Sequence, residues 1–134
     1  MRYLLDTSVF SQPLRRKPVE ASLLRWKAVG DAECGVAIVS VAEVEFGLGL
    51  EDSSRRLEKY RAILEGRLTV LPADDSVWRA FARMKARQQR AGRNVADLDL
   101  LIAATAAVHG LTVATLNTGD FSRIEGIAWE DWGV

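Results

Sequence analysis

Four acidic residues dominate the chemistry that this sequence offers, namely Asp6, Glu43, Asp99 and Asp120. Each stands at or just past the point where an apolar stretch begins or ends. The chain has one His and one Cys, and neither sits in a recognisable nucleophile, zinc or redox motif. Carboxylates without imidazole or thiolate partners are the ligands of hard divalent cations such as Mg²⁺ or Mn²⁺. The sequence therefore predicts a metal site built from oxygen ligands.

Each of these acids also has a purely structural alternative. Asp6, Asp97 or Asp120 can cap a helix, and Glu43 can be the returning half of a capping box, Ser40-x-x-Glu43. Such caps are worth roughly 1 kcal/mol apiece. Capping does not explain why an apolar stretch with the character of a central strand leads directly into Asp6.

Asp97 and Asp99 are two positions apart, which places them about 200° apart around a helix. They therefore cannot both enter one pocket. We expect Asp97 to be the N-cap and Asp99 to lie in the first helical turn, facing the site.

The elements that must position these acids alternate along the chain. Strands are expected at residues 2–5, 36–39, 68–71, 111–115 and 127–129, with a turn at 117–120. Helices are expected at residues 19–29, 40 to about 49, 55–64, about 74–91 and 98–108, the last apolar on nearly every side and so buried. Glycines at positions 47 and 49 predict a helix end or a close packing contact there. Alternating strands and helices indicate a parallel α/β sheet covered on both faces.

A parallel sheet brings the carboxyl ends of its strands to one edge, where ligands bind. Asp6 and Asp120 follow strands that end there, and Glu43 and Asp99 approach from helix starts. Two like charges about 4 Å apart repel by roughly 4 kcal/mol at an effective dielectric near 20. A divalent cation would remove that repulsion.

Length and composition predict one globular domain spanning residues 1–134, with 49% hydrophobic and 27% charged residues. The longest nearly apolar stretch, 100–108, is too short to span a bilayer. The apolar run at the N-terminus stops at Asp6, before a signal-peptide core could form. We therefore expect no membrane contact and a cytoplasmic location, and the lone Cys34 agrees with a reducing compartment.

The net charge is zero, but one segment is strongly basic. Between residues 77 and 96 there are only cationic charges, at Arg79, Arg83, Lys85, Arg87, Arg90 and Arg93. One interpretation is the solvated face of a surface helix. The other is a basic rim for phosphates beside the acidic site.

Several segments together resemble the PIN-domain ribonucleases, and most of all the toxins of bacterial VapBC and FitAB toxin–antitoxin systems. The resemblance covers essentially the whole chain. It is carried by Leu4-Leu5-Asp6-Thr7-Ser8, Ser40-Val-Ala-Glu43-Val, Asp99-Leu-Leu-Ile-Ala-Ala-Thr-Ala, Thr115-Leu-Asn117-Thr-Gly-Asp120-Phe121 and Ile127-Ala-Trp-Glu-Asp-Trp132.

The resemblance implies a three-layer α/β/α fold with a five-stranded parallel sheet, and a Mg²⁺- or Mn²⁺-dependent endoribonuclease that acts as a toxin. It implies an RNA substrate, a cognate antitoxin and a homodimer. The basic stretch would then follow the RNA backbone, with RNA-binding residues at Arg83, Arg87, Arg90 and Arg93. The metal-binding acids would be Asp6, Glu43 and Asp99, with Asp120 as the fourth. Asn117, an amide, would help with a neutral oxygen. Thr7, Ser8 and Thr115 would orient the carboxylates or the scissile phosphate.

Two other functions remain open at this point. A haloacid-dehalogenase-like phosphohydrolase also begins with a strand that ends in Asp, but its chemistry requires a second Asp where this chain has Ser8. A catalytically degenerate PIN module would bind RNA or a protein partner without cutting, and the presence of all four acids argues against it.

Overall fold

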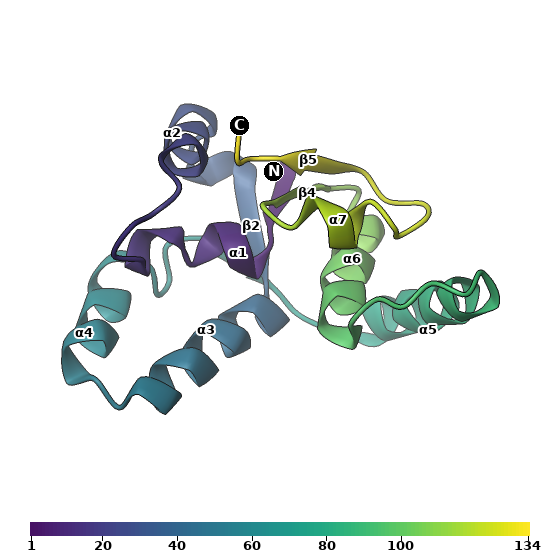
Figure 1. Ribbon diagram of the computed structural model, residues 1–134, viewed down its shortest axis with the longest axis horizontal. Helices are drawn as coiled ribbons and strands as arrows, with labels where there is room; N and C mark the ends of the chain where they lie inside the picture. The colour runs from purple at the N-terminus through teal and green to yellow at the C-terminus, as the bar shows by residue number, and fades with distance from the viewer.

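The computed structural model describes residues 1–134 and contains one five-stranded parallel sheet with helices on both faces (Figure 1). The strands are β1 (Tyr3–Leu5), β2 (Cys34–Ala37), β3 (Thr69–Leu71), β4 (Thr112–Thr115) and β5 (Trp129–Asp131). The helices are α1 (Thr7–Phe10), α2 (Glu20–Val29), α3 (Ile38–Glu51), α4 (Ser54–Ile63), α5 (Asp75–Arg90), α6 (Asp97–His109) and α7 (Thr118–Phe121). Two short 3₁₀ helices are η1 (Gln12–Leu14) and η2 (Asp31–Glu33). The predicted α/β/α architecture is confirmed.

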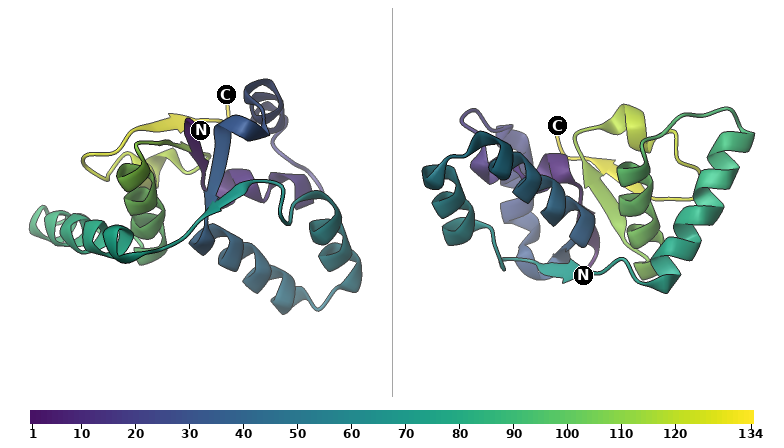
Figure 2. Two further views of the ribbon diagram at one scale, coloured as in Figure 1. Left: turned by 180° about the vertical axis from the view of Figure 1, so that it is seen from behind. Right: turned by 90° about the horizontal axis from the view of Figure 1, so that it is seen from below.

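The strand order is β3-β2-β1-β4-β5, so β1 is the central strand. The chain moves outward from β1 through β2 to β3, then crosses back to β4 and on to β5. Right-handed crossovers in opposite directions place their helices on opposite faces of a sheet. Accordingly α1 to α4 lie on one side and α5 to α7 on the other (Figure 2).

The alternation of side chains along the strands divides the core in two. Leu4 and Val113 pack with α5, α6 and α7, whereas Leu5 and Ala114 pack with α1 to α4. Leu4 and Leu5 are both completely buried, as expected for a central strand covered on both faces. Helix α6 is buried along the run 100–106. The burial predicted for 98–108 is confirmed for this central part, whereas Leu98 and Val108 are exposed.

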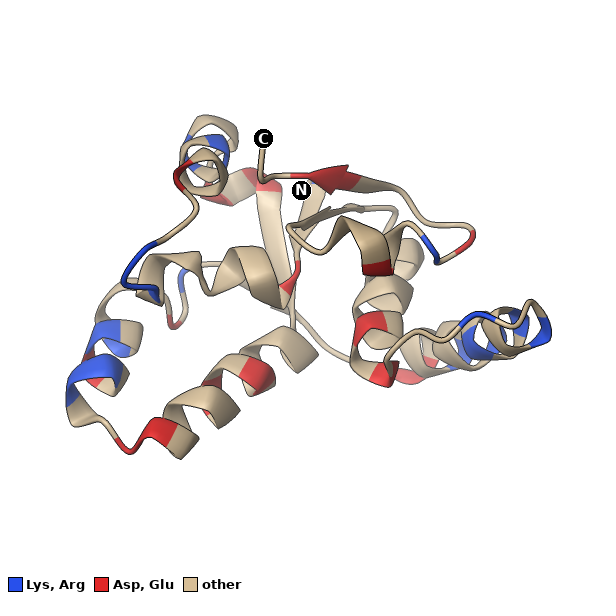
Figure 3. Cartoon of the chain, in the orientation of Figure 1, with Lys and Arg blue, Asp and Glu red and all other residues tan.

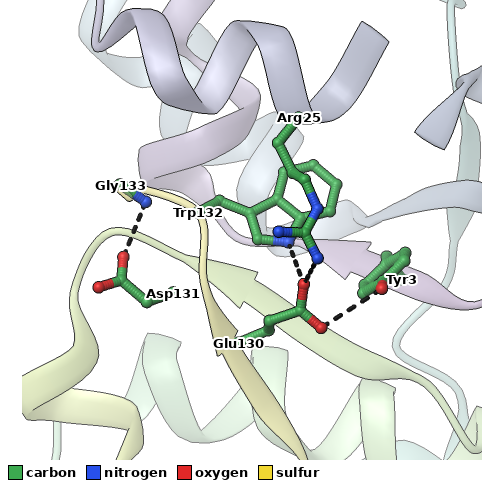
Figure 4. Close-up of polar contacts among 6 residues, drawn as sticks. All are labelled: Tyr3, Arg25, Glu130, Asp131, Trp132 and Gly133. Carbon is green, nitrogen blue, oxygen red and sulfur yellow. Dashed lines mark hydrogen bonds and ion pairs between the residues drawn. The ribbon is translucent and has the colours of Figure 1, made fainter. Parts of the chain in front are cut away.

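The edge strand β5 is held by a cluster of polar and aromatic side chains around Glu130 (Figure 4). Its carboxylate accepts hydrogen bonds from Tyr3 Oη at 3.3 Å and from Trp132 Nε1 at 3.1 Å, and forms an ion pair with Arg25. Trp132 is fully buried, and its ring lies edge-on to that of Tyr3. These contacts join the end of the chain to β1 and α2.

The expected strand at 36–39 ends earlier than predicted, at Ala37. Residues 38 and 39 have no strand to pair with, because Val36 and Ala37 already face the last residues of β1 and β3. Helix α3 therefore begins at Ile38 and runs through both Gly47 and Gly49 to Glu51. The prediction that these glycines end the helix or mark a close contact is wrong, because a Cβ at either would meet nothing within 4 Å.

The early start of α3 also removes the predicted capping box. Ala37 is the N-cap, so Ser40 lies inside the helix, and its buried hydroxyl has no hydrogen-bond partner. The predicted N-cap at Asp97 is wrong as well. Ala96 occupies the cap position, and Asp97 is exposed and paired with Lys85 Nζ at 3.0 Å.

Two expectations near the C-terminus need correction. The turn expected at 117–120 is a single helical turn, α7, with Asn117 at its N-cap. The last strand lies at 129–131 rather than 127–129, because its pairing with β4 starts at Trp129 opposite Val113. None of the helices combines the length and the apolar character needed to cross a bilayer.

Candidate active site

The acids gather where the sheet topology predicts a ligand site. The neighbours of β1 are β2 and β4, and the chain leaves these two toward opposite faces of the sheet, which makes the end of β1 a topological switch point. Asp6 follows β1 directly, Glu43 approaches on α3 from one face, and Asp99 approaches on α6 from the other. Acidic segments of α3, α6 and α7 surround the junction of β1 and α1 in Figure 3.

A pocket of about 210 Å³ opens at this point, and we call it the acidic pocket. No hydrophobic side chain lines it. The lining residues are Asp6, Thr7, Ser8, Arg15, Glu43, Asp99 and Asn117. Three of the four predicted acids therefore reach one pocket although they are far apart in the sequence.

Asp6 is the most rigidly held of the acids. It caps α1 through a 3.0 Å bond from the Val9 N–H to Oδ1, and Ser8 Oγ donates to the same oxygen at 2.6 Å. Thr115 Oγ1 donates to Oδ2 at 2.5 Å. Burial raises the pKa of Asp6 above its usual range, and these hydrogen bonds oppose the rise. The carboxylate of Asp6 therefore both caps α1 and lines the acidic pocket.

The two hydroxyls that hold Asp6 are themselves held by the backbone after β4. Ser8 Oγ accepts from the Leu116 N–H at 3.0 Å, and Thr115 Oγ1 accepts from the Asn117 N–H at 2.8 Å. Each hydroxyl therefore bridges a backbone donor and the Asp6 carboxylate. This arrangement fixes the orientation of the carboxylate relative to the end of β4.

A hydroxyl also holds Glu43, which enters the acidic pocket from α3. Thr7 Oγ1 donates to Glu43 Oε1 at 2.6 Å, which ties the first residue of α1 to α3. Each of the three hydroxyls predicted to orient the carboxylates therefore donates a hydrogen bond to one of them. These hydroxyls belong to Thr7, Ser8 and Thr115.

Asp99 has no such hydrogen bond, and its electrostatics reflect the crowding of negative charge. Burial raises the pKa of Asp99 to about 6, and three neighbouring carboxylates add to the rise. In order of effect they are Asp120, Glu43 and Asp6. The site therefore concentrates carboxylates that repel one another, a charge distribution that a bound cation would stabilise.

The fourth acid is placed differently from the other three. Asp120 is exposed on α7 and does not line the acidic pocket, whereas Asn117 does. Asp120 is nevertheless close enough to raise the pKa of Asp99. Its assignment as the fourth metal-binding acid stays a prediction.

The donor set suits a hard divalent cation, since it consists of carboxylate, hydroxyl and amide oxygens. As the side chains stand, no three acidic, His or Cys groups are arranged to hold one ion together. The carboxylates of Asp6 and Glu43 are engaged by the hydroxyls described above.

None of the four predicted RNA-binding arginines lines the acidic pocket. The basic part of α5 lies at the end of that helix remote from α3 (Figure 3). Arg87 and Arg93 donate to the carbonyls of Glu125 and Arg123, so they also support the loop after α7. Their role in RNA binding stays a prediction.

The pocket contains one basic residue that the sequence did not single out, Arg15. It follows η1 in a segment without helical or strand periodicity, so no pattern placed it beside the acids. The only available signal was the adjacent run Arg15-Arg16-Lys17 before Pro18.

Residues 3–127 match the PIN domain family. The chain is 30% identical to the toxin FitB of Neisseria gonorrhoeae, over 96% of this chain and 97% of that protein. It is 29% identical to the tRNA(fMet)-specific endonuclease VapC of Shigella flexneri, over 98% of both chains.

Solved structures agree with the fold described above. The crystal structure of FitAcB from Neisseria gonorrhoeae superposes with a TM-score of 0.88 at 29% identity, covering 97% of both chains. A member of the VapBC family of toxin–antitoxin systems from Mycobacterium tuberculosis superposes with a TM-score of 0.72 at 30% identity, covering 97% of this chain and 96% of that one.

Proposed function

The chain belongs to the PIN domain family, and from that premise we propose that it is the ribonuclease toxin of a toxin–antitoxin pair, cleaving RNA phosphodiester bonds with a divalent metal ion, Mg²⁺ or Mn²⁺. The observation that carries the proposal is the acidic pocket itself. Asp6, Glu43 and Asp99 come from three different elements and converge on the switch point of the sheet. The relatives named toxin and endonuclease support the same activity.

The chain's own residues prepare the site before substrate arrives. Ser8 and Thr115 hold both oxygens of Asp6, and Thr7 holds one oxygen of Glu43. Such preorganisation lowers the cost of reorienting dipoles during the reaction. Asp6, Glu43 and Asp99 would hold the ion, with Asp120 as the fourth acid and Asn117 as a neutral oxygen ligand. Thr7, Ser8 and Thr115 would orient the carboxylates or the scissile phosphate.

When bound, a divalent cation would offset the charge of the carboxylates and would supply Lewis-acid chemistry, which polarises a phosphate and lowers the pKa of an attacking water. The lone His109 closes the far end of α6 and lies outside the pocket. No imidazole is therefore placed to act as the general base, and the carboxylates are the proton acceptors available in the pocket.

A cognate antitoxin, a homodimer and a cytoplasmic location complete the proposal. They are supported by the full-length likeness to toxins of the VapBC and FitAB kind. Residues of the RNA-binding surface are proposed on α5, at Arg83, Arg87, Arg90 and Arg93, because this stretch carries no acid to repel phosphates.

The activity is tested with a fluorogenic single-stranded RNA and a Mn²⁺ or Mg²⁺ titration. The wild-type chain should cleave only when the metal is present, and Asp6→Asn and Asp99→Asn should each lose cleavage by at least about a hundredfold. A phosphomonoester offered to the same proteins should not be hydrolysed. A wild-type chain that binds the RNA but never cuts it would instead identify a degenerate PIN module.

A further inference from the structure

A second pocket of about 360 Å³ adjoins the acidic pocket, and we call it the flanking pocket. It lies between the α1–η1 segment and helices α3 and α4. The two pockets share Thr7, Arg15 and Glu43 among their lining residues. A polymer seated in one can therefore continue into the other without leaving the surface.

Two arginines outnumber the one carboxylate, Glu43, among the charged residues of the flanking pocket that form no ion pair. Arg15 and Arg16 line it, both are exposed, and neither takes part in any ion pair of the structure. The third arginine, Arg56, is already engaged, since its Nε lies 3.2 Å from Glu51 Oε2. Arg15 and Arg16 are thus free to bind an anion.

The loop that carries these two arginines is built to hold them in place. Gln12 is 4% exposed, and its side chain joins the two ends of the loop. Its Nε2 donates to the Ser8 carbonyl at 2.8 Å, and its Oε1 accepts from the Val19 N–H at 2.8 Å. Arg56 Nη2 adds a 2.9 Å bond to the carbonyl of Leu14, directly before Arg15.

The remaining wall leaves room for a ribose or a base. Val44 and Leu48 line the pocket from α3 but are only 7% and 8% exposed, and Gly47 stands between them without a side chain. A Cβ at Gly47 would meet nothing within 4 Å. A groove with basic side chains that follow the phosphate backbone is a feature of proteins that bind single-stranded nucleic acid.

We propose that the flanking pocket is the path of the RNA strand next to the cleaved bond, with Arg15 and Arg16 binding the phosphates that flank the scissile one. This assignment rests on the ribonuclease function proposed above. It places the phosphate contacts nearest the cleaved bond on the loop after η1, in addition to those proposed on α5. Arg15 and Arg16 bind the backbone, so they contribute affinity and register but no choice of sequence.

The first experiment measures RNA binding in a chain that does not cut. The Asp99→Asn protein is titrated against a fluorescein-labelled single-stranded RNA of mixed sequence, in 50 to 200 mM KCl with Mn²⁺ present. Arg15→Ala and Arg16→Ala should each weaken binding by about threefold and flatten the plot of log affinity against log salt by about 0.7. The exposed Arg61 on α4 lines neither pocket, and Arg61→Ala should change neither quantity.

The second experiment uses two glycines of α3 as a matched pair. Gly47→Glu places a carboxylate in the flanking pocket and should weaken RNA binding by about tenfold. Gly49→Glu replaces a glycine of the same helix, two positions on and outside this pocket, and should leave binding unchanged. Equal effects of the two variants would overturn the assignment.

The kinetic consequence separates this assignment from the proposed function. In the active chain, which keeps Asp99, the substitution Arg15→Ala should raise the KM for RNA about threefold and change kcat by less than twofold. The assignment is overturned if Arg15→Ala and Arg16→Ala bind RNA as the wild type does while Arg83→Ala or Arg90→Ala flattens the salt dependence. It is also overturned if the loop variants impair only the capture of an antitoxin peptide. In either case Asp6-dependent cleavage would leave the ribonuclease function standing.

Discussion

Thr115 and Asp6 are separated by 109 positions in the sequence, yet Thr115 Oγ1 donates a 2.5 Å hydrogen bond to Asp6 Oδ2. Both residues are almost completely buried. The same hydroxyl accepts from the Asn117 N–H, so it joins the ends of the two central strands β1 and β4. One hydroxyl therefore serves the fold and the site together.

Replacing Thr115 by Val keeps the shape of the side chain and removes the hydroxyl. The buried Asp6 Oδ2 and the Asn117 N–H then lose their partner, and the free energy of unfolding should fall by about 1–3 kcal/mol. Cleavage should fall as well, because Asp6 Oδ2 loses the hydroxyl that holds it. Thr115→Ser should recover most of both quantities in urea unfolding and RNA cleavage assays. Equal stability of wild type and Thr115→Val would contradict the role of the hydroxyl.

The raised pKa of Asp99 predicts how stability depends on pH without metal. A carboxyl whose folded pKa of about 6 exceeds its ordinary value of 3.8 holds its proton more tightly in the folded chain. The free energy of unfolding should therefore decrease as pH rises from about 4 to about 6, and level off above that. Burial raises the pKa of Asp6 in the same direction.

Asp99→Asn removes this titration, so its free energy of unfolding should decrease less over that pH range. The mutant should also be more stable than the wild type at pH 7, because the repulsion from Asp120, Glu43 and Asp6 is gone. Denaturant unfolding in EDTA at pH 4, 5, 6 and 7 measures both effects. Parallel pH profiles for the two proteins would refute the crowding of charge at this position.

The fold was largely predictable, because the alternation of apolar strands with helices is strong and local. The convergence of Asp6, Glu43 and Asp99 was predictable too, since carboxyl ends of parallel strands meet at one edge. Arg15 was not, because its position depends on a loop tied by Gln12 rather than on any period in the sequence.

The errors have a common physical cause, which is tertiary pairing. The residues at 38 and 39 favour a strand, but no neighbouring strand extends far enough to pair with them. Starting α3 at Ile38 then turns Ser40 from an apparent cap into a buried residue of the first turn. Local capping signals cannot show where a neighbouring strand stops.

Ser40 supplies a stability test of that correction. Its hydroxyl is fully buried without a partner, so Ser40→Ala removes an unsatisfied polar group and adds a better helix former. The free energy of unfolding should rise by about 0.5–1 kcal/mol in urea titrations. A loss of about 1 kcal/mol, as expected for a deleted N-cap, would show instead that Ser40 caps the helix.

The proposed function depends on a divalent cation that binds in the acidic pocket. The melting temperature of the chain with and without metal tests whether it does. A ligand that binds only the folded state at a hundred times its Kd stabilises that state by about 2.7 kcal/mol. Mn²⁺ or Mg²⁺ should therefore raise the melting temperature of the wild-type chain by several degrees, and Asp6→Asn should abolish the increase. Equal metal-induced shifts in the two proteins would contradict the claim.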